Sequence, residues 1–278
     1  MPTSNRQAVL RRLEAEALAI RRNIWRALRA GGSGHMGGSL SAADLLAALY
    51  FRFLRVRPDE PDWPDRDRFV LSKGHANAAL GAVLVRAGFC DESLLDRFYG
   101  YESPFGMHPD ITLAGVEMST GGLGHGLSVG LGMALGARLQ GRDFRTVVMI
   151  GDGELQEGSN WEAAMAAAHH GTSALTAIVD YNKVQQSGHV DAMLGIEPLA
   201  DKWAAFGWEV REVDGHDMER IVTALDALPC SDSRPTVIIA HTVKGKGTSF
   251  AEDSYLWHST MVPDDVYRRA MAELGGEP

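Results

Sequence analysis

A change of hydrophobic period between residues 146 and 184 indicates the central unit of this chain. An apolar run, Thr146–Ile150, stops at Gly151-Asp152-Gly153, a helical pattern follows, and a second apolar run stops at Asp180-Tyr181-Asn182. Continuous apolar runs are typical of buried strands, so the change from strand to helix and back predicts a βαβ unit. Because such crossovers join parallel strands, both strands should end at the same edge of one sheet.

Other segments repeat this alternation of strand and helix patterns. Apolar residues recur at helical spacing from about residue 6 to residue 30, which predicts a long amphipathic N-terminal helix. We predict further strands at Arg68–Leu71, Gly207–Val213 and Thr236–Ala240. This order predicts an α/β fold with a mostly parallel sheet and helices on both faces. Because no internal repeat or break in composition is present, residues 1–278 are predicted to form a single domain.

The helical patterns also predict local detail. The arginine-rich face of the N-terminal helix is predicted to be solvated, because Glu14 and Glu16 interrupt its positive charge. Ser41 is predicted to cap a largely apolar helix that continues to Phe53. The Ala- and Gly-rich stretch Ala76–Ala87 is predicted to form a tightly packed helix.

Composition and charge argue against several classes of function. The formal net charge is −9, and the sequence has no basic run or aromatic-interleaved patch, so we do not expect binding of nucleic acid. No segment has the apolar length that a bilayer requires, and the N-terminus lacks the apolar region of a signal peptide, so a cytoplasmic protein is expected. Cys90 and Cys230 are isolated and lack metal-ligand spacing, as expected for thiols in a reducing compartment.

Polar residues at the ends of the two central strands have the chemistry of a magnesium site. Asp152 offers a carboxylate, Asn182 an amide oxygen, and Val184 a backbone carbonyl. Mg²⁺ prefers hard oxygen ligands and usually completes its shell with phosphate and water oxygens. Gly151 and Gly153 let the backbone approach a phosphate, and the following helix N-terminus favours its charge. The alternative is an ordinary strand-to-helix turn with a solvated Asp152.

Four histidines lie in loops that strand polarity or glycine content places near this edge: His35, His75, His108 and His258. Histidine can donate to phosphate and transfer protons near neutral pH, which suits cofactor anchoring and acid–base catalysis. A structural zinc site is the competing interpretation, but the sequence lacks the short-range ligand pairs usual for zinc. The glycine-rich run Ser119–Gly126 can cradle a phosphate through backbone amides, although close helix packing explains its glycines equally well.

Eight motifs in order resemble the N-terminal, diphosphate-binding half of transketolase over nearly the whole chain. They are SGHMGGSLSAADLLAALY, DRFVLSKGHA, FGMHPD, GVEMSTGGLGHGLSVGLGMA, GDGELQEGSNWEA, VDYNKV, PLADKWAAFGWEVREVDGHD and HTVKGKG followed by WHS. The resemblance implies a fold that binds thiamine diphosphate through Mg²⁺, or through Ca²⁺ or Mn²⁺ in its place. It also implies that Asp152, Asn182 and the Val184 carbonyl hold this metal.

The resemblance assigns roles to further residues. It implies that His75 and His258 contact the diphosphate, and that His35 and His108 meet the donor ketose and the reacting carbons. Residues expected to contact the cofactor are His75, Gly121, Leu123, Gly151, Asp152, Gly153, Asn182, Lys244 and His258. Glu157 and Glu162 resemble the carboxylates that join two active sites across a subunit interface, although acidic residues near a helix N-terminus are favourable without that role.

The implied reaction transfers a two-carbon ketol unit from a ketose, or a ketose phosphate, to an aldose. A full transketolase continues into a pyrimidine-binding domain and a C-terminal domain, which supply the glutamate at the aminopyrimidine ring and most ligands of the sugar phosphate. We therefore expect this chain to be inactive alone and to work with a C-terminal partner subunit in an α2β2 assembly. Gly122, His125 and Ser187 stand where the family usually has proline, glutamine and aspartate, and the last two put the identity of the sugar in doubt.

Two other functions remain open from the sequence. The α subunit of a thiamine-dependent 2-oxo acid dehydrogenase shares the metal motif, but the SGHMGG and SKGHA segments speak against it. A catalytically silent scaffold or regulatory half would bind cofactor or partner without turnover. An assay with a lipoyl acceptor separates the first from transketolase, and an assay of ketol transfer separates the second.

Overall fold

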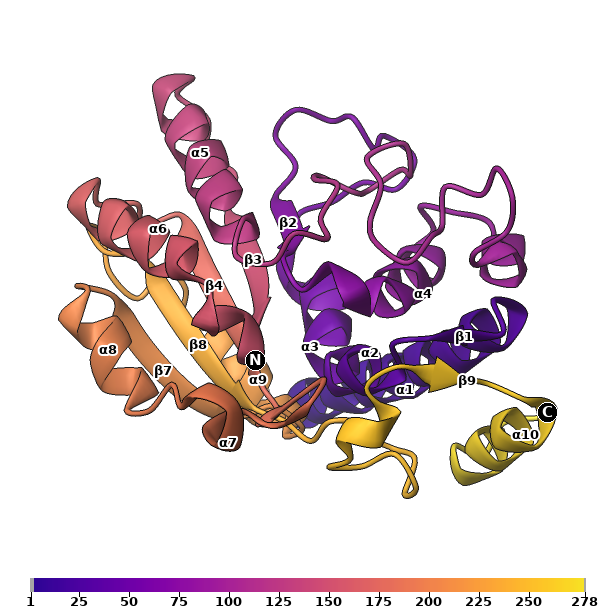
Figure 1. The fold of residues 1–278 in the computed structure, drawn as a ribbon. Helices are drawn as coiled ribbons and strands as arrows, with labels where there is room; N and C mark the ends of the chain where they lie inside the picture. Colours follow the sequence, from indigo (N-terminus) through magenta and orange to yellow (C-terminus); the bar gives the residue numbers. More distant parts are fainter. Residues whose placement is uncertain (1–2, 278) are drawn as a thin grey trace.

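Five parallel strands form the central sheet in the order β2–β3–β4–β8–β7 (Figure 1). The computed structural model of the chain describes residues 3–277. Its strands are β1 (Ser33–Gly34), β2 (Arg68–Leu71), β3 (Thr146–Gly151), β4 (Leu175–Tyr181), β5 (Val184–Gln185), β6 (Gly188–His189), β7 (Glu209–Asp214), β8 (Thr236–His241) and β9 (Thr260–Met261). Its α-helices are α1 (Thr3–Ala30), α2 (Met36–Ser41), α3 (Ala43–Ala48), α4 (Asn77–Ala87), α5 (Gly126–Leu139), α6 (Gly158–His169), α7 (Val190–Leu194), α8 (Leu199–Ala205), α9 (Met218–Asp226) and α10 (Asp264–Glu273).

Helices cover both faces of the sheet, as predicted. Successive side chains of a strand point to opposite faces, and each face of β3 joins a different hydrophobic cluster. Val147 and Met149 pack into the cluster that contains α1, α3, α4 and α9, whereas Val148 and Ile150 pack into the cluster that contains α5, α6 and α8. Figure 1 shows α5, α6 and α8 on one side of the sheet and α1 to α4 on the other. The predicted fold class is therefore confirmed.

The long helix α1 buries its predicted apolar stripe, but the prediction of a solvated arginine face is wrong for one residue. The buried stripe residues are Leu13, Ala17, Ile20, Ile24 and Leu28. Arg21 is only 7% exposed, because its guanidinium makes two hydrogen bonds to the Asp44 carboxylate of α3 at 3.1 and 2.5 Å. A carboxylate on the neighbouring helix thus compensates the buried charge, which the pattern of α1 alone does not reveal.

The predicted cap at Ser41 is also wrong. The helix begins at Met36, within the glycine-rich segment, and Ser41 is the last residue of α2. A short α3 and a π-helical turn, Leu49–Phe53, follow in place of one continuous helix. Ser41 Oγ donates a hydrogen bond to Asp180 at 2.6 Å, so this hydroxyl joins α2 to the sheet.

Two further predictions agree with the structure, with one boundary shifted. The stretch predicted to pack tightly forms α4, and an added Cβ at Gly81 would lie 2.1 Å from the Phe105 ring. Strand β7 begins at Glu209, two residues later than predicted, because Gly207 has a φ of +86° and ends the preceding turn. Among residues 3–277, none of the helices combines the length and apolarity needed to cross a bilayer.

Candidate functional site

Loops that follow the parallel strands meet at one edge of the sheet and enclose a cleft of about 370 Å³. Asp152 follows β3 and Asn182 follows β4, and both side chains line this cleft. The loops after β2 and β8 bring His75 and Lys244 to the same place. The βαβ pattern therefore predicted correctly that the two strand ends carry Asp152 and Asn182 to one site.

Most of the site residues predicted from the sequence line this cleft. They are His35, His75, Gly121, Leu123, Asp152, Gly153, Glu157, Asn182, Val184, Lys244 and His258. Of the other three predicted residues, two adjoin residues of the cleft and the third lies outside it. Gly151 is the last residue of β3. His108 packs on Gly121, where an added Cβ would lie 3.2 Å from the imidazole ring. Glu162 is exposed on α6, farther along that helix than Glu157.

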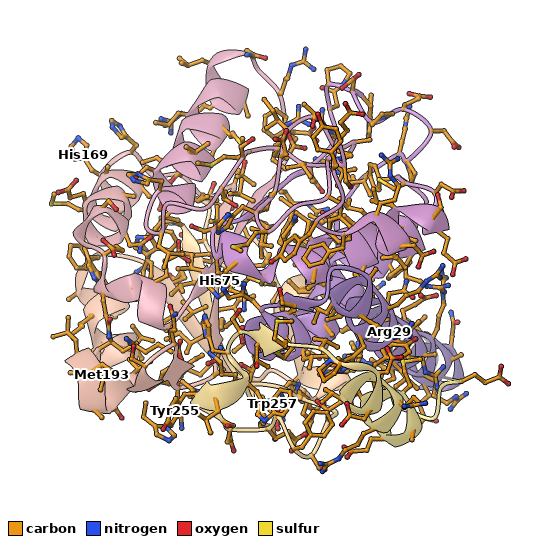
Figure 2. The ribbon with its side chains drawn as sticks, turned by 45° about the vertical axis from the view of Figure 1, so that its right-hand side comes forward. Arg29, His75, His169, Met193, Tyr255 and Trp257 are labelled. Carbon is orange, nitrogen blue, oxygen red and sulfur yellow. The ribbon has the colours of Figure 1, made fainter. Side chains whose placement is uncertain are left out.

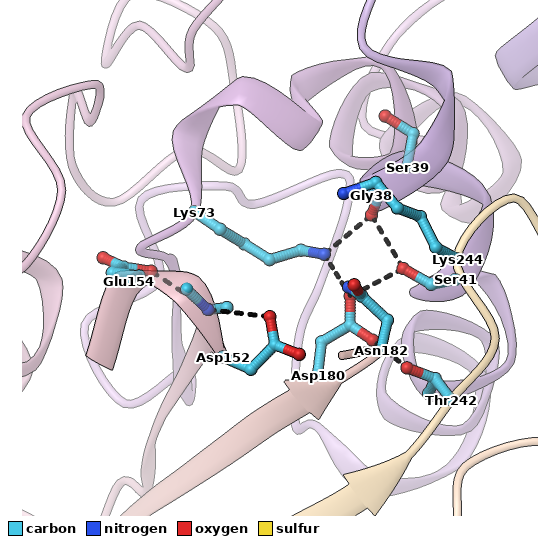
Figure 3. A network of polar contacts seen from close by, with 12 residues as sticks. Gly38, Ser39, Ser41, Lys73, Asp152, Glu154, Asp180, Asn182, Thr242 and Lys244 are labelled. Atoms are coloured by element: carbon cyan, nitrogen blue, oxygen red, sulfur yellow. Dashed lines mark hydrogen bonds and ion pairs between the residues drawn. The ribbon is translucent and has the colours of Figure 1, made fainter. Parts of the chain in front are cut away.

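A buried ion pair lies beneath the cleft, as Figure 3 shows. Asp180 of β4 is fully buried and accepts a hydrogen bond from Lys73 Nζ, which also donates to the Gly38 carbonyl at 2.7 Å. The Ser41 and Thr242 hydroxyls donate to the same carboxylate. Burial alone would raise the pKa of Asp180, but the Lys73 charge and these donors hold it below its ordinary value. One carboxylate therefore joins α2, β4 and the loops after β2 and β8.

The same carboxylate orients the amide of Asn182. Asn182 Nδ2 donates to Asp180 Oδ2 at 3.3 Å, and Asn182 Oδ1 accepts from the Val184 N–H at 3.1 Å. Nitrogen therefore points toward the buried carboxylate, and oxygen points toward the segment that carries the other predicted ligand. This orientation is the one that a metal ligand needs, because an amide coordinates a hard cation through oxygen.

A second buried carboxylate joins the glycine-rich loop to the end of β3. Glu154 accepts hydrogen bonds from Ser72 Oγ at 2.5 Å and from the backbone N–H groups of Gly124 and Gly151 at 2.9 and 3.1 Å. Burial raises the pKa of Glu154. Its three donors come from three separate segments, so Glu154 holds the glycine-rich loop against the end of β3.

The helix predicted to follow the glycine motif is α6, but it does not begin next to Asp152. A 3₁₀ turn, Gly153–Gln156, follows Asp152, and α6 begins only at Gly158. The turn is stabilised where Glu154 bonds back to the Gly151 N–H, so the chain does not enter an α-helix at once. Any phosphate near Asp152 would therefore meet the backbone of this turn rather than the first turn of α6.

The chemistry of Asp152 fits a bound cation. Its carboxylate accepts hydrogen bonds from the Gly153 N–H at 2.7 Å and from the Lys183 N–H. Burial raises the pKa of Asp152 to about 7, and the negative charge of Asp180 adds to the shift. A divalent cation would remove this penalty. With the Asn182 amide and the Val184 carbonyl, Asp152 would provide an all-oxygen set of ligands, which suits Mg²⁺.

Lys244 is a buried cation in the same cleft, beside the predicted ligand Val184. Its Nζ donates to the Val184 carbonyl at 2.5 Å and lies 2.9 Å from His258 Nδ1. Burial lowers the pKa of Lys244 to about 8. An ammonium group with so little solvent around it is well placed to hold an anion such as a diphosphate, since Coulomb attraction is stronger in a low-dielectric site.

Three of the predicted histidines form a cluster on the cleft wall. The ring centroids of His35, His75 and His258 lie 5.2–5.5 Å apart. Burial lowers the pKa of all three, to about 4 for His35 and about 3 for His258, and lysine charges add to the shift. His75 lies near the centre of the molecule, whereas His169 and Met193 lie at its edge (Figure 2).

The protonation state of this cluster limits what it can do. Near neutral pH its imidazoles are uncharged, so they can donate or accept hydrogen bonds. His35 Nδ1 is buried and has no hydrogen-bond partner among the described residues, which fits a polar ligand in the cleft. Within residues 3–277, no group of three His, Cys, Asp or Glu side chains is arranged to hold a metal ion.

Lys73, Asp180 and Glu154 were missed as functional residues by the sequence analysis. Each lies within three residues of a strand end at the carboxyl edge of the sheet. That position is the one available signal, because ligands of open α/β sheets bind there. Of the residues that depart from the transketolase pattern, Ser187 lines the cleft, whereas Gly122 and His125 are exposed in the loop before α5.

The fold and the cleft together define an α/β domain whose candidate ligand site lies at the carboxyl edge of a parallel sheet. Residues 14–278 match the family described as "Transketolase, thiamine diphosphate binding domain". The chain therefore belongs to the transketolase family.

Relatives of nearly equal length are named as transketolase subunits. The chain is 40% identical over 262 residues to an apulose-4-phosphate transketolase subunit of Phocaeicola vulgatus, and the match covers 94% of this chain and 93% of that protein. It is 41% identical over 266 residues to the 6-deoxy-6-sulfo-D-fructose transketolase subunit SqwG of a Clostridium species, and that match covers 95% and 97%.

Solved transketolases have the same fold over almost all of this chain. The enzyme of Campylobacter jejuni superposes with a TM-score of 0.90 at 33% identity, covering 96% of this chain and 43% of that one. The Pichia stipitis transketolase complexed with sedoheptulose-7-phosphate gives a TM-score of 0.90 at 31% identity, covering 96% and 41%. The chain thus spans about two fifths of the solved transketolases it matches.

Proposed function

We propose that this chain is the N-terminal, diphosphate-binding subunit of a two-chain transketolase. The reaction transfers a two-carbon ketol unit from a ketose or ketose phosphate to an aldose. One observation carries the proposal: the same cleft contains three oxygen ligands and a buried ammonium group. The oxygen ligands come from Asp152, Asn182 and Val184, and the ammonium group is that of Lys244. A cation and an anion that share one site fit a metal-bound diphosphate.

Different residues of the cleft would bind the metal ion and the cofactor. Asp152, Asn182 and the Val184 carbonyl would hold Mg²⁺, or Ca²⁺ or Mn²⁺ in its place. Residues proposed to contact thiamine diphosphate are His75, Gly121, Leu123, Gly151, Gly153, Lys244 and His258, together with the metal ligands. When bound, this cofactor supplies the carbon nucleophile that accepts the ketol unit.

The histidines would serve the sugar as well as the cofactor. His75 and His258 are proposed to donate hydrogen bonds to the diphosphate, and His35 and His108 to hold the donor ketose and move protons at its oxygens. Their uncharged state supports this assignment, because a neutral imidazole can both donate and accept. His35 is the histidine best placed to contact the donor ketose, since its Nδ1 is buried on the cleft wall without a protein partner among the described residues.

A partner subunit is part of the proposal. Relatives that match this chain nearly end to end are named as subunits, and this chain spans about two fifths of the solved transketolases. We propose a partner that supplies the pyrimidine-binding and C-terminal domains, in an α2β2 assembly in which Glu157 and Glu162 lie at the subunit interface. The single-domain organisation of residues 1–278 and the cytoplasmic location remain predictions within this proposal.

The substrate is proposed only as a class. The names of two relatives refer to apulose-4-phosphate and 6-deoxy-6-sulfo-D-fructose, which are a ketose phosphate and a sulfonated ketose. We propose that this chain also takes an anionic ketose. Ser187 in the cleft is a position at which preference for the sugar could differ from that of other transketolases.

The test is reconstitution of ketol transfer. The chain, its candidate C-terminal partner and the mixture are each assayed with thiamine diphosphate, Mg²⁺, a panel of ketose donors and an aldose acceptor. The proposal expects transfer in the mixture only. No transfer with any ketose donor would favour a silent binding subunit, and transfer to a lipoyl acceptor would favour a 2-oxo acid dehydrogenase.

A further inference from the structure

A series of side-chain contacts outside the cleft ends next to Lys244. Arg21 of α1 holds the Asp44 carboxylate of α3 through two hydrogen bonds, and both residues are less than 9% exposed. Asp44 Oδ2 also lies 2.7 Å from Nδ1 of His216, which follows β7. His216 Nε2 in turn accepts a hydrogen bond from the Val243 N–H at 2.8 Å. This chain of contacts thus runs from α1 to the backbone of the loop after β8.

The two partners of His216 determine its tautomer. A backbone N–H can only donate, so the Nε2 atom that faces Val243 must be unprotonated. The proton of the neutral ring therefore lies on Nδ1 and is donated to Asp44. Burial would raise the pKa of Asp44, but His216 and Arg21 hold it below its ordinary value, so the acceptor is a carboxylate.

The loop that carries Lys244 has other anchors on its far side. The Gly245 N–H donates to the Gly37 carbonyl at 3.0 Å, and Arg21 Nε donates to the Lys246 carbonyl at 3.0 Å. Gly245 has a φ of +77°, and an added Cβ would lie 2.2 Å from the Ala251 carbonyl oxygen. Because the backbone is held on both sides of Lys244, the place that its ammonium reaches depends on these anchors.

We propose that His216 is a positioning residue, which fixes the loop after β8 so that Lys244 reaches the diphosphate of the cofactor. This inference rests on the proposed binding of thiamine diphosphate. His216 does not line the cofactor cleft but a neighbouring cavity, which shares Asn182 and Val184 with it. It acts through its hydrogen bond to Val243.

A pair of matched substitutions separates this role from simple packing. In His216→Gln the longer side chain places an amide oxygen near the position of Nε2 and keeps an acceptor for Val243. In His216→Asn the shorter amide lies near the position of Nδ1 and leaves the Val243 N–H without its acceptor. His241→Asn is the control, since the Nε2 of His241 contacts the Glu212 carboxylate at the surface, 2.8 Å away.

Affinity for thiamine diphosphate is measured by calorimetry with Mg²⁺, on the full chain combined with its partner subunit. We expect His216→Asn to weaken binding about tenfold, the order of one net hydrogen bond. His216→Gln should stay within about threefold of the wild type, and His241→Asn should match it. Wild-type affinity in His216→Asn would overturn the inference.

A double-mutant cycle with Lys244→Met shows whether His216 acts through Lys244. If it does, the loss caused by His216→Asn should shrink to less than about twofold in the Lys244→Met background, because coupled residues are not additive. A full, additive loss would overturn the inference while leaving the proposed function intact. If neither the wild type nor the variants bind the cofactor, the proposed function fails instead.

The tautomer of His216 can be measured on the wild-type chain without any cofactor. Nitrogen NMR should show a protonated Nδ1 and an unprotonated Nε2 for this ring. A protonated Nε2 would overturn the inference, even if the variants do not fold.

Discussion

At the scale of single residues, the site depends on buried charges that compensate one another. Lys73 and Asp180 are at most 1% exposed and contact each other beneath the cleft, and the Asp180 carboxylate also accepts from three other side chains. A buried ion pair is costly to form, but removal of one partner is costlier still, since it leaves the other charge without compensation. The pair therefore holds Asn182 and the surrounding loops in place only while both charges are present.

Neutralising one member of this pair should destabilise the protein strongly. For Asp180→Asn we expect a loss of about 3–5 kcal/mol in the free energy of unfolding, measured by urea denaturation, because the Lys73 ammonium stays buried. Glu212→Gln is the matched control, since it removes a carboxylate that contacts His241 at the surface and should cost about 1 kcal/mol or less. Equal effects of the two substitutions would contradict this account.

The clustered histidines should make the cofactor-free chain sensitive to acid. The native pKa values of His35 and His258 are lowered to about 4 and 3 from an ordinary value of 6.5. The unfolded chain therefore takes up protons first, and the contribution of these groups to stability, complete above pH 6.5, is lost as the pH falls toward 4. Asp152 has the opposite sign, because its raised pKa favours the native state as the pH falls from about 7.

Comparison with His258→Asn isolates the histidine contribution from that of Asp152. The free energy of unfolding of the wild type, minus that of the variant, should decrease as the pH is lowered from 7 to 4.5. Urea denaturation at several pH values gives this difference. A difference that does not change with pH would show that the His258 ring is not buried in the uncharged state.

At the scale of helices and strands, close packing beside the site depends on small residues. The parallel sheet and its helix cover on both faces followed from the alternation of strand and helix patterns, because the hydrophobic period reports which face of each element is buried. The π-helical turn and the early start of α2 did not, since Gly37 and Gly38 resemble a loop until their neighbours are known. An added Cβ at Gly37 would lie 2.8–2.9 Å from Lys244 carbons and the Trp257 carbonyl, a close approach that depends on distant chain segments.

Helix α4 should tolerate no added carbon where it meets Phe105. We expect Gly81→Ala to lower the free energy of unfolding by about 1–3 kcal/mol, because its Cβ would overlap the buried ring. Gly132→Ala on α5 is the control, since an added Cβ there meets no atom within 4 Å, and alanine favours a helix. Thermal unfolding of the two variants tests the contrast, and a stabilised Gly81→Ala would show that α4 and the Phe105 loop pack less tightly than described.

At the scale of the whole molecule, the part of the site that the sequence predicts is the part that lies at strand ends. Asp152 and Asn182 each follow an apolar run, so topology alone brings them together. The support beneath them was not predictable, because Lys73 and Asp180 are 107 residues apart and no local pattern links two such positions. The same holds for the contacts that join Arg21 and Asp44 to His216. Ligands could thus be proposed from spacing, whereas their supporting network required the fold.

The central claim is that this chain holds the diphosphate end of thiamine diphosphate through a divalent cation at Asp152. The most direct measurement is calorimetric titration of the cofactor into the chain combined with its partner subunit, with and without Mg²⁺, for the wild type, Asp152→Ala and the exposed control Asp201→Ala. We predict Mg²⁺-dependent binding that Asp152→Ala abolishes and Asp201→Ala retains. Binding by Asp152→Ala at wild-type strength would contradict the claim.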